Sequence, residues 1–170
     1  RYKTTEIQPD EKGESFQKEP IENITTWVFE EGTFVPTAKI QEGKQYSIVS
    51  DYLGTPIQMY DEQGNKTWDC TLDIYGKVLA IDKGTEFDCP FRYQGQYEDE
   101  ETGLYYNRFR YYDSNAGSYI SQDPIGLESD TLNFYDYVCD LNDGIDPLGL
   151  YNPYGNKKGG GFKKKPGRKP

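Results

Sequence analysis

Short apolar and aromatic runs, each ended by a turn sequence, constrain the fold of this chain more than any other feature. Apolar and polar residues alternate over residues 45–49 and 68–74, which is the period of a half-buried β-strand. The sequences Leu-Gly-Thr-Pro at 53–56 and Glu-Gln-Gly-Asn at 62–65 separate such runs and favour turns. Because turn residues interrupt the apolar runs, no helical stripe develops. Residues 23–150 are therefore predicted to be all-β, a series of hairpins with almost no helix of three turns or more.

Tyrosine supplies the packing surface for such a sheet. Only 34% of the residues are hydrophobic and the formal net charge is −10, which is close to the boundary at which chains stay unfolded. The 16 Tyr and two Trp carry large rings that pack on strands while their polar tips stay in water. We therefore expect a thin-walled β structure. No apolar run approaches the roughly 20 residues of a membrane-spanning helix, so no membrane span is expected.

The chain has no histidine, and this limits the chemistry that it can perform. Catalysis of the Ser-His-Asp and Cys-His types is excluded, which leaves carboxylates as the acid-base groups. The three cysteines, Cys70, Cys89 and Cys139, have no Cys-x-x-Cys spacing and are interpreted as ordinary packing residues. We expect no metal site and no cofactor.

Two copies of the sequence Asp-Pro-x-Gly-Leu begin at Asp123 and Asp146. A single copy is most simply a turn, because Asp accepts backbone hydrogen bonds and Gly tolerates a positive φ. A pair has a second use. Aspartic-type hydrolysis needs two carboxylates that share one proton, and two rigid turns can bring such a pair together. The spacing is compatible with both interpretations.

Longer motifs surround these two turns. The segment 46–78 resembles the YD repeats of Rhs proteins and of insecticidal toxin-complex subunits. Denser matches to the Rhs repeat-associated core follow at 91–97 (FRYQGQY), 101–113 (ETGLYYNRFRYYD), 117–127 (GSYISQDPIGL), 133–138 (NFYDYV) and 146–150 (DPLGL). The chain thus resembles the C-terminal end of the Rhs/YD-repeat polymorphic toxin family, related to toxin-complex C subunits.

The resemblance implies a domain organisation. Residues 1–22 are expected to be a polar fragment start, within a longer polypeptide. Residues 23–90 are expected to form YD-repeat strands in the wall of a β-cocoon, and 91–150 the Rhs-associated core with a self-cleavage module. Residues 151–170 are then the basic start of the variable C-terminal toxin region.

The resemblance also implies an aspartic autoprotease that acts once on its own chain. Its catalytic residues are Asp123, Asp146 and Arg110, and its scissile bond joins Leu150 to Tyr151. An arginine beside the pair would keep one carboxylate ionised or stabilise the oxyanion. Arg108 is the alternative, because in a continuous strand both arginines point to the same face.

This assignment carries geometric expectations for the pair. We expect the carboxylates of Asp123 and Asp146 to lie within about 6 Å of each other, with like-charge repulsion raising the pKa of one of them. The guanidinium of Arg110 should approach at least one carboxylate.

The segment after Leu150 differs in charge from the rest. Residues 151–170 hold seven of the 19 cations and none of the 29 acids. The segment is either a flexible linker or the cation-rich start of a toxin that acts on nucleic acid. Contact with nucleic acid is expected only through this basic tail. Because the charges are complementary, we expect the acidic shell to retain it.

The resemblance further implies partners and a location. The partners are the protein's own N-terminal shell and C-terminal toxin segment, together with secretion-apparatus, chaperone and immunity proteins. The location is that of a secreted bacterial effector delivered to a target cell in competition between bacteria. Two alternatives stay open: a non-catalytic structural plug of the shell, and a surface adhesion or carbohydrate-binding β-repeat.

Overall fold

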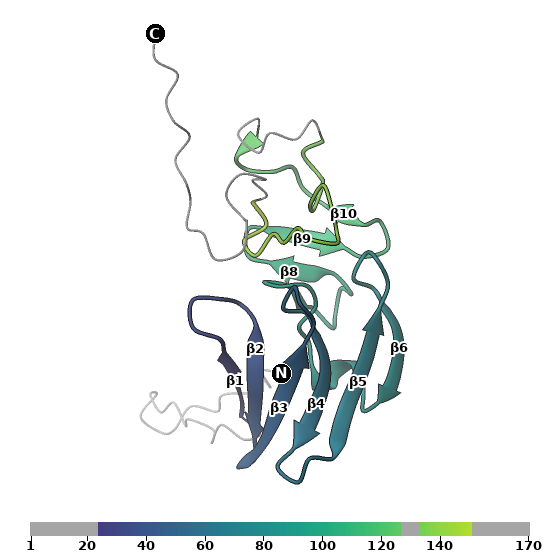
Figure 1. Cartoon of the computed structure of the whole chain (residues 1–170). Coiled ribbons are helices and arrows are strands. Elements are labelled where there is room, and N and C mark those ends of the chain that lie inside the picture. The colour runs from purple at the N-terminus through teal and green to yellow at the C-terminus, as the bar shows by residue number, and fades with distance from the viewer. Residues whose placement is uncertain (1–23, 127–132, 151–170) are drawn as a thin grey trace, which may run out of the picture.

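The computed structural model describes residues 24–126 and 133–150, which form two antiparallel sheets (Figure 1). The first sheet has six strands in sequence order: β1 (Thr25–Phe29), β2 (Pro36–Gln41), β3 (Lys44–Ser50), β4 (Pro56–Asp61), β5 (Lys66–Leu72) and β6 (Val78–Lys83). The second has the order β10-β9-β8-β7, with β7 (Tyr97–Glu98), β8 (Tyr105–Asn107), β9 (Arg110–Asp113) and β10 (Ser118–Tyr119).

The all-β prediction is confirmed. Within the described ranges the helical conformation is of the 3-10 type, at Glu86–Asp88 and at Gly126, and no helix is long and apolar enough to cross a membrane. The expected fragment start at 1–22 and the basic region at 151–170 lie outside the described residues.

One aspartate turn is repeated between the strands of the first sheet. In the loop after β3, the Asp51 carboxylate accepts the backbone N–H groups of Leu53 and Thr55, each at 2.9 Å. Gly54 donates its N–H to the Asp51 carbonyl and has a φ of +88°, which glycine adopts without strain. The loops that begin at Asp61 and Asp73 repeat this arrangement. The local sequence Asp-x-x-Gly therefore closes each of these hairpins.

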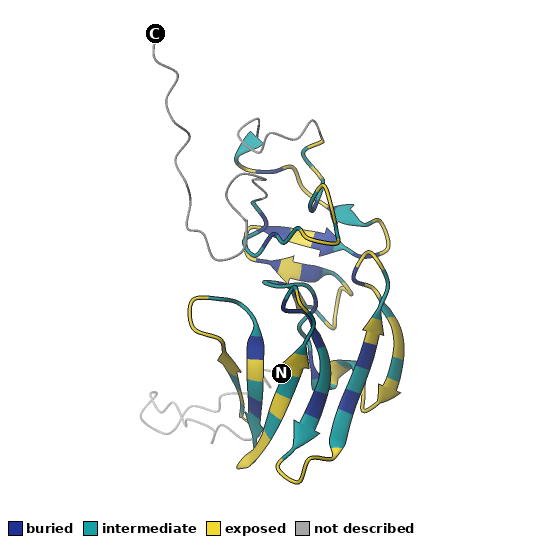
Figure 2. Ribbon diagram, in the orientation of Figure 1, coloured by how far each residue is buried: buried dark blue, intermediate teal, exposed yellow. Residues whose placement is uncertain are grey.

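The core of the first sheet is small and is centred on one tryptophan. Met59, Trp68, Cys70 and Cys89 are buried together, and Met59 pairs with Trp68 across β4 and β5 (Figure 2). The Trp68 indole donates a hydrogen bond to the Thr85 carbonyl at 3.0 Å. Burial raises the pKa of Cys70 and Cys89 to about 11, so both stay protonated packing residues. Cys139 is exposed, so for this residue the packing interpretation is wrong.

Tyrosines form the second core and connect it to the first sheet. Four of them are buried in one cluster: Tyr105, Tyr112, Tyr119 and Tyr137. The hydroxyl of Tyr105 donates to the Gly76 carbonyl at 3.0 Å, and that of Tyr112 donates to the Tyr75 carbonyl at 2.9 Å. Both acceptors lie in the turn between β5 and β6. The rings therefore fill the second core while their hydroxyls fix it to the end of the first sheet.

We predict that Trp68→Ala destabilises the chain by about 3–5 kcal/mol, because it removes a fully buried ring and leaves a cavity in a small core. Urea denaturation followed by circular dichroism measures the loss. Leu79→Ala, at an exposed position of β6, should change the unfolding free energy by no more than about 0.5 kcal/mol. Equal effects of the two substitutions would contradict the assignment of the core.

Candidate active site

A single buried guanidinium joins the two Asp-Pro motifs. Arg110 begins β9 and is 2% exposed. Its Nη2 lies 3.1 Å from Oδ2 of Asp123 and 3.3 Å from Oδ2 of Asp146, and both aspartates are buried. The structure thus brings together the three residues that the sequence singled out. The Oδ2 atoms of Asp123 and Asp146 are therefore separated by no more than the sum of these two distances.

Each aspartate closes a turn similar to the aspartate turns of the first sheet. Oδ1 of Asp123 accepts the N–H of Ile125 at 2.9 Å, and Oδ1 of Asp146 accepts the N–H of Leu150 at 2.9 Å. Gly149 has a φ of +69°, and a Cβ at this position would lie 2.5 Å from the carbonyl oxygen of Asn107. Glycine is therefore required where the second motif passes β8.

The chain end that carries the predicted scissile bond is bound to the β8–β9 hairpin. Nε of Arg110 donates to the Gly149 carbonyl at 2.6 Å, and the Phe109 N–H donates to the Leu148 carbonyl at 3.3 Å. Leu150 is half-buried, and Tyr151 lies outside the described residues. Arg110, which contacts both carboxylates, thus also binds the residue before Leu150, and Leu150 itself donates its N–H to Asp146.

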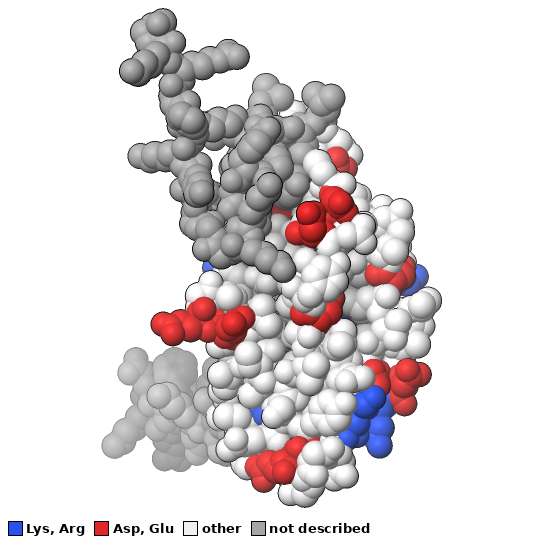
Figure 3. Space-filling model, viewed as in Figure 1, with Lys and Arg blue, Asp and Glu red and all other residues white. Residues whose placement is uncertain are grey.

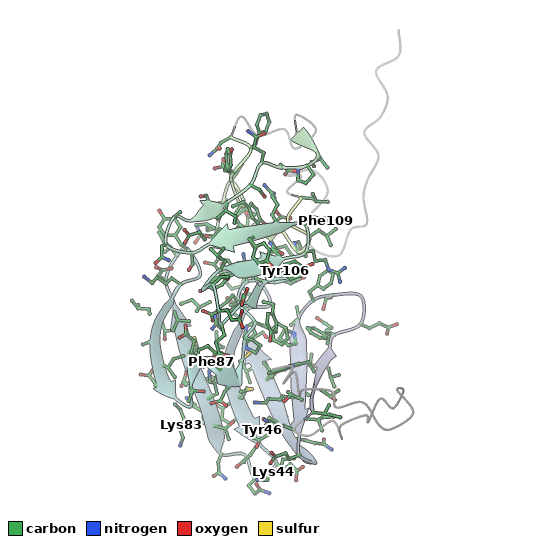
Figure 4. The ribbon with its side chains drawn as sticks, turned by 180° about the vertical axis from the view of Figure 1, so that it is seen from behind. Lys44, Tyr46, Lys83, Phe87, Tyr106 and Phe109 are labelled. Carbon is green, nitrogen blue, oxygen red and sulfur yellow. The ribbon has the colours of Figure 1, made fainter. Side chains whose placement is uncertain are left out.

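Arg108 has a different role from Arg110. β8 ends at Asn107 and β9 begins at Arg110, so Arg108 and Phe109 form the turn between them, and Phe109 projects from its tip (Figure 4). Arg108 has a φ of +57°, and its guanidinium lies over the Phe34 ring at 4.6 Å. The expectation that both arginines point to one face of a continuous strand is wrong, because the strand is interrupted between them.

Burial sets the charge properties of Asp146. It raises the pKa of this carboxyl to about 6, above the usual 3.8. Hydrogen bonds from Tyr119 and the Leu150 N–H, together with the charge of Arg110, oppose this rise. Repulsion from Asp123 is the smallest of these contributions. The sequence predicts a raised pKa from like-charge repulsion, but removal from water is the main cause.

Sequence reasoning missed the uncharged residues around Asp146. The Tyr119 hydroxyl donates to its Oδ2 at 2.8 Å, and the Tyr137 hydroxyl accepts its backbone N–H at 3.4 Å. The Asn107 amide donates to the Tyr119 hydroxyl at 2.6 Å. The Arg110 guanidinium also stacks on the Tyr119 ring at 3.6 Å. Both tyrosines lie inside the recognised motifs, but nothing separates them from the other Tyr residues of the sequence.

The chain is similar to several known proteins. The Teneurin YD-shell family matches residues 19–145. The chain is 38% identical over 125 residues to double-stranded DNA deaminase toxin A of Burkholderia cenocepacia (strain H111), a match that covers 72% of this chain and 9% of that protein. It is 45% identical over 105 residues to toxin protein Tse5 of Pseudomonas aeruginosa (strain PAO1), covering 61% of this chain and 8% of that protein.

A solved structure shares the fold over most of the chain. The crystal structure of TcdB2-TccC3 without its hypervariable C-terminal region is similar with a TM-score of 0.62 and 26% identity, covering 74% of this chain and 6% of that chain. The present chain therefore spans less than a tenth of the length of these three proteins.

The raised pKa of Asp146 predicts how stability depends on pH. Between about pH 4 and about pH 6 the Asp146 carboxyl is protonated in the folded chain but mostly ionised in the unfolded chain. The protonated carboxyl therefore stabilises the fold fully below about pH 4, and this stabilisation is lost as the pH rises through about 6. Asp146→Asn cannot titrate. From pH 4 to pH 7, the parent should therefore lose about 2–3 kcal/mol of unfolding free energy relative to the variant.

Urea denaturation at the two pH values measures this difference. Both proteins are compared as chains that end at Leu150, so that cleavage cannot separate them. A difference in unfolding free energy that stays constant with pH would contradict the raised pKa.

Proposed function

Because the chain belongs to the Teneurin YD-shell family, we propose that it is the C-terminal portion of an Rhs toxin-encapsulating shell. In this proposal it cleaves its own backbone after Leu150 by an aspartic-protease mechanism and frees the C-terminal toxin inside the shell. The observation that carries the proposal is a pair of buried carboxylates on one guanidinium, one of which also binds the N–H of Leu150.

Paired carboxylates hydrolyse a peptide by sharing one proton. The ionised member accepts a proton from water, and the water oxygen attacks the carbonyl carbon of Leu150. The protonated member then gives its proton to the nitrogen of Tyr151 as the C–N bond breaks. Arg110 stabilises the negative charge that develops during the attack, since its planar guanidinium is fixed by contacts to Phe134 and Gly149 carbonyls.

Tethering supports a single turnover. Asp146 lies four residues before the bond that it would cut, so enzyme and substrate are one chain with a high effective concentration. The Leu150 N–H donates a hydrogen bond to the Asp146 carboxylate at 2.9 Å. This bond restricts the orientation of Leu150, whose carbonyl is attacked.

Charge supports retention of the released segment. Three cations of the described part, Lys39, Arg92 and Arg110, are buried, and acidic side chains predominate on the face drawn in Figure 3. Residues 151–170 carry seven cations and no acid. An acidic shell attracts such a segment over about 8–10 Å at physiological ionic strength. We propose that the tail stays associated after the cut.

The wider setting belongs to the same proposal. Residues 23–90 would form the shell wall, and 91–150 would close it as the self-cleavage module. Two relatives are named as toxins. We propose that the present protein is likewise an exported bacterial effector that meets secretion-apparatus, chaperone and immunity proteins.

A structural plug is the second candidate function. The favouring observation is that Nε, Nη1 and Nη2 of Arg110 all have partners, so the network closes without any chemistry. A plug needs the same residues for stability but leaves the chain intact. The two candidates therefore differ in the covalent state of the bond after Leu150.

We predict that Asp123→Asn and Asp146→Asn each yield one uncleaved chain, whereas the parent is cut between Leu150 and Tyr151. Asn keeps the size of Asp but cannot exchange a proton near neutral pH. Intact mass of the purified, denatured proteins measures the outcome. Asp82→Asn on exposed β6 is the matched control, and Cys139→Ser is a second control; both should be cut like the parent. Complete cutting of Asp123→Asn would exclude the aspartic mechanism.

We predict a second contrast between the two arginines. Arg110→Lys keeps the charge but loses the fork that binds two carboxylates and two carbonyls, so the rate of cleavage should fall at least about tenfold. Arg108→Lys changes a turn residue that lies over Phe34 and should leave the rate within about twofold. The rates are measured by gel densitometry after synthesis. A larger loss for Arg108→Lys would move the catalytic assignment to that residue.

A further inference from the structure

The Asn107 side chain fixes the direction of a buried hydrogen-bond chain. Its Nδ2 lies 2.9 Å from the carbonyl oxygen of Asp146 and 2.6 Å from the hydroxyl of Tyr119, and all three residues are buried. A carbonyl oxygen can only accept, so the atom that faces it has to be the amide nitrogen. The second hydrogen of this nitrogen then points at Tyr119. The Tyr119 oxygen is therefore an acceptor from Asn107.

This arrangement commits the hydroxyl hydrogen of Tyr119 to Asp146. The hydroxyl lies 2.8 Å from Oδ2 of Asp146, which also faces Nη2 of Arg110 at 3.3 Å. Oδ1 of Asp146 accepts the Leu150 N–H. Each of these three contacts brings a hydrogen toward the Asp146 carboxyl. Such a set of donors favours the ionised form of a carboxyl.

We propose that Tyr119, oriented by Asn107, is a positioning residue that favours the ionised form of Asp146, so that Asp146 is the member of the pair that activates the water. The inference rests on the proposed self-cleavage and assigns the roles within it. Asp146 takes the proton of the attacking water while the oxygen–carbon bond to Leu150 forms. A proton of the pair then passes to the Tyr151 nitrogen, which keeps the electron pair of the broken C–N bond. The pair again holds one proton at the end.

The groups around Asp146 determine how the reaction should depend on pH. Arg110 faces its carboxylate from β9, Tyr119 from β10 and Asp123 from the opposite turn, while Tyr137 meets its backbone N–H. Burial raises the pKa of Asp146 most, and the Tyr119 hydrogen bond is the first of the opposing contributions. Without this hydroxyl the pKa of Asp146 should rise further. Because the base has to be ionised, the acid limb of the cleavage profile should then move to higher pH.

The test compares the pH profiles of two phenylalanine variants. The full chain is isolated uncleaved under denaturing conditions and diluted into refolding buffers from about pH 4 to about pH 8, a range that brackets the limb. Intact mass gives the first-order rate of cleavage at each pH. Tyr119→Phe removes the hydroxyl that donates to Asp146. Tyr112→Phe is the matched control: its ring contacts that of Tyr119, but its hydroxyl donates to the Tyr75 carbonyl.

We expect Tyr119→Phe to move the midpoint of the acid limb upward by about one pH unit, with cleavage about tenfold slower below the limb and little changed above it. Tyr112→Phe should keep the midpoint of the parent. An unchanged midpoint in Tyr119→Phe, an equal slowing at every pH, or the same shift in Tyr112→Phe would overturn the role of Tyr119.

A second variant is used if Tyr119→Phe does not fold. The parent protein tells failure of the Tyr119 role apart from failure of self-cleavage itself. If circular dichroism shows that Tyr119→Phe does not refold, Asn107→Leu decides, because it keeps the hydroxyl but removes the donor that orients it. An upward shift of the midpoint is expected, and no shift overturns the inference. A parent that is cut after Leu150 while the variants show no shift leaves self-cleavage standing. A refolded parent that stays intact at every pH overturns both proposals.

Discussion

The contact of Arg110 with two carboxylates is the interaction on which the rest of the site depends. Its guanidinium is buried among Asp123, Asp146 and two backbone carbonyls and rests on the Tyr119 ring. Removing such a cation from water is costly, and only a well-placed set of acceptors offsets the cost. One cation between two carboxylates leaves an excess negative charge, which favours a shared proton. The same contact that brings the two turns together thus prepares them for acid-base chemistry.

The candidate catalytic aspartates close turns like those between the strands of the first sheet, but in a buried environment. The Asp61 carboxylate stays in water, so burial does not outweigh its hydrogen bonds. These bonds, first of all that from the Asn65 amide, lower its pKa. Asp146 accepts the N–H four residues on in the same way, but the tyrosine core excludes water from it and its pKa rises. Burial therefore changes a turn-closing carboxylate into a titratable group near neutral pH. The tyrosine core provides that burial and also supplies Tyr119 as a donor.

The sequence predicted the features that depend on local chemistry. The alternation of apolar and polar residues predicted β3 and β5. The predicted family is confirmed by the match to the Teneurin YD-shell family. The pairing of the two motifs with Arg110 came from the resemblance, and their catalytic role stays a prediction. The position of Arg108 was missed because a two-residue turn inside an aromatic run has no Gly or Pro to mark it. Tyr119 was missed because its role depends on contacts between residues far apart in the chain.

Self-cleavage in water enriched in heavy oxygen tests the central claim most directly. The full chain is refolded from its uncleaved, denatured state in this solvent, and the products are analysed by mass spectrometry. Direct hydrolysis by water at the aspartate pair predicts an N-terminal product that ends at Leu150 and carries one heavy oxygen in its new carboxyl group, together with a partner that begins at unlabelled Tyr151. An intact chain, a cut at another bond, or a Leu150 carboxyl without the heavy isotope would contradict the account.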